Sequence, residues 1–61
     1  MPLVEVTLYD RRVNEETSKK LIEKMTDVLV ECTSEELRPE VWVVVKGLPA
    51  HQWGIGGKPG S

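Results

Sequence analysis

The residue with the most unusual chemistry in this sequence is Pro2, which follows Met1 and begins an apolar run. An initiator methionine is commonly removed ahead of a small residue such as proline, and removal here would expose a secondary amine. Such an amine accepts a proton near neutral pH when its surroundings lower its pKa. With Met1 retained, the nitrogen is an amide without basicity. Pro2 is therefore a candidate general base, provided that Met1 is removed.

Other reactive residue types occur singly. Cys32 is the one cysteine and His51 the one histidine, so the sequence offers neither an internal disulfide nor a zinc-ligand set, and no metal or cofactor is predicted. Cys32 is expected to be a buried, unreactive thiol. The segment Gly54–Gly57 looks like a phosphate loop, but no helix follows it whose N-terminus could bind an anion, so it is predicted to form a hairpin.

The elements that position these residues can be read from the spacing of apolar residues. Strict alternation predicts a strand over Leu3–Tyr9, and Asp10–Arg12 then reads as a polar turn. Asn14 is suited to cap a helix whose first turn is acidic. One face of this helix is predicted to pack on a sheet through residues at helical spacing: Leu21, Ile22, Met25, Val28, Leu29 and Cys32.

After the helix, Thr33 and Glu36 resemble a capping box that opens one short helical turn ended by Pro39. The β-branched run Val41–Val45 is typical of a strand covered on both faces, so strand, helix and strand are predicted to form one βαβ unit. From Gly47 onward, a short hairpin is predicted, with a loose end at residues 58–61.

The composition narrows the class of protein. Sixty-one residues allow one domain, spanning residues 1–61, and such a chain buries too little surface to be more than marginally stable alone, so self-association is predicted. The net charge of −2 argues against nucleic acid as a partner. No apolar run is long enough to cross a membrane, and the N-terminus lacks a signal-like segment, so a cytoplasmic protein is expected.

The order of these features resembles the 4-oxalocrotonate tautomerase family. The shared features are the proline after the initiator methionine, an arginine ten residues later, the long helix, the valine-rich strand, and Trp53-Gly54-Ile55-Gly56-Gly57. The resemblance covers essentially the whole chain. It implies that Pro2 is the general base and that Trp53 is part of an apolar wall. It also implies that Arg12, supplied by a neighbouring subunit, binds a carboxylate of the substrate. It also implies dimers that share a four-stranded sheet and assemble as a trimer of dimers.

The chain departs from this resemblance at Trp42, where well-studied family members carry a second arginine that binds the carbonyl and carboxylate oxygens of the substrate. Trp42 either lines the site or packs against a neighbouring subunit. Arg11 would be an extra basic neighbour of Arg12. With no second cation, stabilisation of the dienolate oxygen would come from an ordered water, a backbone N–H near Tyr9 or an arginine of a partner chain.

Three functions remain open on this basis. The first is a cofactor-independent isomerase that moves a proton in an unsaturated 2-oxo or 2-hydroxy acid, with Pro2 as base. The second is a subunit of a heterohexamer that a related chain completes. The third is a hydratase or dehalogenase in which Pro2 is a charged acid.

Overall fold

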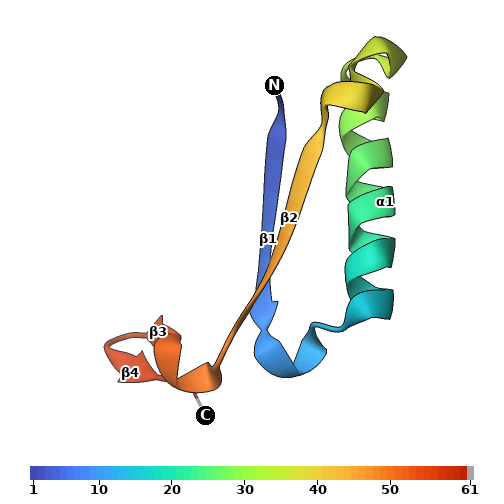
Figure 1. Ribbon diagram of the computed structural model, residues 1–61. Helices are drawn as coiled ribbons and strands as arrows, with labels where there is room; N and C mark the ends of the chain where they lie inside the picture. Colours follow the sequence, from blue (N-terminus) through green and yellow to red (C-terminus); the bar gives the residue numbers. More distant parts are fainter. Residues whose placement is uncertain (61) are drawn as a thin grey trace.

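Two parallel strands form the centre of the fold. In the computed structural model, which describes residues 1–60, β1 (Leu3–Tyr9) pairs with β2 (Trp42–Leu48) from Leu3 opposite Trp42 to Tyr9 opposite Leu48 (Figure 1). The predicted first strand is confirmed. The second is longer than predicted, because backbone pairing continues after the valine run ends. Gly47 permits this extension, since a Cβ there would lie 3.1 Å from the Cα atom of Asp10.

The helix α1 (Glu15–Cys32) connects the two strands and lies along one side of them (Figure 1). Its start is the predicted one, because the Asn14 side-chain oxygen accepts a hydrogen bond from the Thr17 N–H at 2.8 Å. Between β1 and α1, residues Asp10–Arg12 form a single 3₁₀ turn, η1. The predicted strand, helix, strand order is therefore confirmed.

The helix packs through a narrower face than the sequence predicts. Leu21, Met25 and Leu29 are half-buried, and Val30, which the prediction omitted, is the one fully buried residue of the described chain, at 6% exposed. The predicted burial of three residues is wrong within one chain: Ile22, Val28 and Cys32 are exposed. Two strands cover only a small arc of a helix, so residues at the edges of the apolar stripe stay in solvent.

The connection from α1 to β2 also differs from its prediction. The Thr33 hydroxyl donates to the Leu29 carbonyl at 2.7 Å. It therefore gives a hydrogen-bond partner to a backbone carbonyl in the last turn of α1 and does not cap a new helix. The next element, η2 (Glu35–Glu40), is a 3₁₀ helix that contains Pro39 and is preceded by Ser34 without a side-chain cap. The predicted capping box from Thr33 to Glu36 is therefore wrong.

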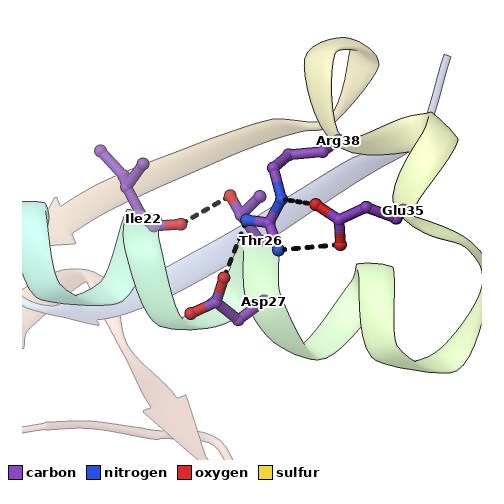
Figure 2. Close-up of polar contacts among 5 residues, drawn as sticks. All are labelled: Ile22, Thr26, Asp27, Glu35 and Arg38. Carbon is purple, nitrogen blue, oxygen red and sulfur yellow. Dashed lines mark hydrogen bonds and ion pairs between the residues drawn. The ribbon is translucent and has the colours of Figure 1, made fainter.

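Arg38 ties η2 to α1. Its Nε donates to Glu35 at 2.6 Å, and one terminal nitrogen donates to Asp27 of α1 at 2.8 Å (Figure 2). The hydrogen bond from Arg38 lowers the pKa of Glu35 below its ordinary value of 4.5. The hydrogen bonds to Glu35 and Asp27 raise the pKa of Arg38.

The lowered pKa of Glu35 predicts a small acid sensitivity. Because the folded chain favours the charged carboxylate, its stabilising contribution is present above pH 4.5 and is lost as the pH falls through the folded-state pKa. Glu35→Gln should therefore lose less melting temperature than the unmodified chain when the pH is lowered through this range. Glu16→Gln, which alters only an exposed pair with Lys20, is the matched control. Equal acid sensitivity in all three proteins would contradict the assignment.

The C-terminal segment forms the predicted hairpin. After a 3₁₀ turn, η3 (Ala50–Gln52), strand β3 (Gly54–Ile55) pairs antiparallel with β4 (Lys58–Pro59). Gly56 and Gly57 have φ angles of 61° and 84°, the conformation that a two-residue hairpin turn requires. The prediction of a loose end at residues 58–61 is wrong for residues 58–60, because β4 pairs and the Gly60 N–H donates to the Trp53 carbonyl at 2.8 Å. Ser61 lies outside the described residues.

The single chain buries almost no hydrophobic core of its own. Its radius of gyration is 14.2 Å, whereas a compact domain of this length has about 10.5 Å. Its accessible surface is 4820 Å², compared with about 4000 Å² for a compact monomer. The sheet face away from α1 is open (Figure 1). Among residues 1–60, no helix is long and apolar enough to cross a membrane.

Candidate active site

Pro2 lies at the start of β1, beside the first residue of β2. Its carbonyl accepts a hydrogen bond from the Trp42 N–H at 2.9 Å. Its nitrogen is bonded to Met1 in the 61-residue chain and is therefore an amide. Met1 is 84% exposed, so this bond lies at the surface, where it is accessible for removal of Met1. The structure thus brings two of the predicted site residues, Pro2 and Trp42, together at one end of the sheet.

A second group of predicted site residues gathers at the opposite end. The rings of Tyr9 and Trp53 lie 5.0 Å apart between centroids and are tilted by 52°. The guanidinium carbon of Arg11 lies 4.7 Å from the centre of the Tyr9 ring, within the range of a cation–π contact. The strand register brings these residues together, since Tyr9 ends β1 opposite Leu48, at the end of β2 that leads to Trp53.

The guanidinium of Arg11 contacts the Tyr9 ring, whereas the guanidinium of Arg12 is uncommitted, meaning that it has no partner among residues 1–60. It is exposed in η1 and makes no hydrogen bond or ion pair with any residue from 1 to 60. An uncommitted guanidinium can bind a carboxylate through two parallel hydrogen bonds. At this end of the sheet, Arg12 is therefore better placed than Arg11 to bind an acidic ligand.

Trp53 carries the one buried side-chain donor without a hydrogen-bond partner among the described residues, its indole Nε1. The Gly60 backbone packs closely beside Tyr9 and Trp53, because a Cβ at Gly60 would lie 2.9 Å from the Ala50 carbonyl, 3.2 Å from the Tyr9 hydroxyl and 3.4 Å from the Trp53 Cβ. Sequence reasoning missed this role of Gly60. A signal was present only in its position just after the hairpin, where a close approach of backbone requires glycine.

The two groups do not meet within one chain. Pro2 precedes β1 and Arg12 follows it, and about eight residues at ~3.3 Å each separate them by roughly 25 Å. Figure 1 shows the N-terminus and η1 at opposite ends of the strands. No pocket forms within residues 1–60. The predicted site residues therefore form two groups, which we call half-sites, one with Pro2 and Trp42 and the other with Arg12 and the Tyr9–Trp53 pair.

Arg38 is a cation at the Pro2 end that the sequence did not single out. It lies in η2, which ends two residues before Trp42. It is an obvious candidate for the missing second cation, but its guanidinium already faces Glu35 and Asp27. Its charge is compensated twice within the chain, so Arg38 does not replace an arginine at position 42.

Comparison with known proteins gives a family match and a similar crystal structure. Residues 2–60 match the family described as Tautomerase enzyme. The crystal structure of DmpI from Helicobacter pylori is similar in fold, with a TM-score of 0.82 and 20% sequence identity over 95% of this chain and 88% of that one. A search of curated proteins gave no match. The chain therefore belongs to the tautomerase family, which confirms at family level the resemblance seen in its sequence.

Proposed function

We propose that this chain, after removal of Met1, is a cofactor-independent tautomerase that moves a proton within an unsaturated 2-oxo or 2-hydroxy acid. Family membership supports tautomerase-type activity in general. The observation that carries the specific proposal is the position of Pro2 at an accessible end of β1, beside the apolar Trp42. Removal of Met1 there produces a secondary amine on a rigid ring directly ahead of β1.

The proposed reaction is balanced without a co-reactant. The Pro2 amine removes the proton of the 2-hydroxyl group, and the electron pair of the broken O–H bond forms the 2-oxo carbonyl. The C2=C3 electron pair then takes a proton at C3, supplied by the protonated amine. Substrate and product are isomers, and the amine returns to its neutral form.

Two features of the chain favour a neutral amine before substrate binds. If a second copy covered the exposed Trp42 and Leu3 side chains, their apolar surface would disfavour the ammonium form, because a charge is poorly solvated in apolar surroundings. The positive charge of Arg12 would act in the same direction if a second copy brought it to Pro2. Arg12 would then also hold the carboxylate, which fixes the reacting carbon near the amine.

Assembly is part of the proposal because each chain presents only two half-sites. The open sheet face and the extended shape of the chain support self-association, in the trimer-of-dimers arrangement that the family resemblance implies. The absence of an uncommitted cation near Pro2 within residues 1–60 favours one alternative, a heterohexamer in which a related chain supplies that charge. Native mass of the purified chain distinguishes them, since a homohexamer forms without a partner.

The activity is tested with protein whose Met1 removal has been verified by intact mass. Conversion of an enol such as phenylenolpyruvate to its keto form is followed by absorbance across pH. Base catalysis predicts that kcat/KM falls as the pH is lowered and the amine becomes protonated. A rate that falls as the pH rises would instead support the hydratase or dehalogenase alternative, in which Pro2 is a charged acid. No turnover by trimmed, assembled protein would reject the proposal.

A further inference from the structure

The surface next to Pro2 is apolar. Trp42 is 56% exposed and Leu3, its partner in the strand register, is 54% exposed. Both belong to the open face of the sheet, because burial alternates along the two strands and the other face is turned to α1. Val44, two residues further along β2, continues the same surface. In the single chain, an indole and two aliphatic side chains are therefore exposed at the Pro2 end of the sheet.

The charged groups around this surface do not favour a second carboxylate. Arg38 is paired with Glu35 and Asp27, at 2.6 and 2.8 Å. Lys46, on the same open face, is paired with Glu5 at 3.1 Å. The same η2 helix also carries exposed Glu36 and Glu40. Within residues 1–60, the side chains at the Pro2 end thus have excess negative charge, and none of them is an uncommitted guanidinium or ammonium group.

We propose that the site accepts monocarboxylate 2-hydroxy or 2-oxo acids with a flat apolar tail, and that Trp42 is the surface on which this tail stacks. This inference rests on the proposed tautomerase function and specifies its substrate class. Arg12 would bind the one carboxylate, and the rest of the substrate would lie over the indole. An aromatic or diene tail gains contact with the ring there, whereas a second carboxylate would lose its hydration without gaining a partner.

The first test uses the unmodified, Met1-trimmed protein and compares two enols. One is phenylenolpyruvate, with a single carboxylate and a phenyl tail. The other is a dienol of similar length that carries a second carboxylate at its far end. The proposal expects a kcat/KM about 10- to 100-fold higher for the phenyl compound. A preference for the dicarboxylate would overturn the inference and leave the tautomerase function standing. Turnover of neither enol would reject the function and the inference together.

The second test changes Trp42 itself. Trp42→Ala should lower kcat/KM for phenylenolpyruvate about tenfold and affect enolpyruvate, which has no tail, much less. Trp42→Phe keeps an aromatic face and should retain most of the preference. Native mass and circular dichroism establish that both variants fold and assemble. If Trp42→Ala assembles and keeps the same ratio of phenylenolpyruvate to enolpyruvate activity, the indole does not contact the tail and the inference fails.

Trp42→Arg provides the converse test. The new guanidinium could pair with a distal carboxylate, so relative activity on the dicarboxylate enol should rise. The same change replaces a large apolar surface by a charge, and a lower melting temperature is expected. An unchanged substrate preference in a folded, assembled Trp42→Arg protein would place position 42 outside the site and overturn the inference.

Discussion

A chain that keeps one residue ahead of Pro2 is expected to lose turnover, by about 10²- to 10⁴-fold in kcat, the usual contribution of a positioned general base. The reason is that an amide nitrogen has no lone pair available to accept a proton. Such a protein can be made by cleaving a tag so that a single glycine remains before Pro2. The rate is measured with phenylenolpyruvate, and intact mass establishes that the glycine is present in all molecules.

Pro2→Ala is the matched comparison for this loss. Met1 is removed ahead of alanine as well, so this variant keeps a terminal amine, now primary and less rigidly held. Its activity should lie between those of the native and blocked chains. A blocked chain that turned over as fast as the trimmed one would show that the Pro2 amine is not the base.

The second large effect is expected at Arg12. Hydrogen bonds between charged groups contribute about 1.5–3 kcal/mol each, and each 1.4 kcal/mol is tenfold, so Arg12→Ala should lower kcat/KM for an acid by at least the loss of one such bond, about 10- to 100-fold. The loss should appear mainly as a higher KM, because the carboxylate is bound in both the ground state and the transition state. The measurement is steady-state kinetics with an enol acid and with its neutral ester or amide analogue.

Lys24→Ala serves as the control for the change of charge, because Lys24 is an exposed cation on α1, away from both half-sites. It should leave both substrates unaffected. Arg12→Ala should affect the neutral analogue much less than the acid. Equal losses on acid and neutral substrates would mean that Arg12 supports the fold or the assembly and does not bind the carboxylate.

Much of the fold could be predicted because its signals are local. The alternation of Leu3–Tyr9, the side-chain cap at Asn14 and the glycine pair at the hairpin turn each depend on residues close in sequence. The wrong predictions concern side chains whose burial depends on how the helix packs on the strands. Ile22 and Cys32 are exposed because two strands cover only part of the helix. The spacing of apolar residues in the sequence carries no information about the width of that covered part.

The candidate site was predictable as a set of residues but not as an arrangement. Pro2 was predicted from the chemistry of its amine after removal of Met1, whereas the roles of Arg12 and Trp53 came from the family resemblance. The contact between Tyr9 and Trp53 depends on the register of two strands that lie far apart in sequence. The pairing of Arg38 with Asp27 likewise requires η2 to fold back on α1 (Figure 2), and together with the ion pair to Glu35 it shows that Arg38 is not a free cation near Pro2.

The central claim is that one site takes Pro2 from one chain and Arg12 from another, and complementation between two inactive chains tests it most directly. The Arg12→Ala chain and the glycine-blocked Pro2 chain are mixed in equal amounts, unfolded and refolded together. If the residues come from different chains, random assembly makes about a quarter of the sites complete, and activity should recover to that level. If both residues came from the same chain, no site would be complete. Mixed assemblies shown by native mass to contain both chains, yet no more active than either parent, would contradict the account.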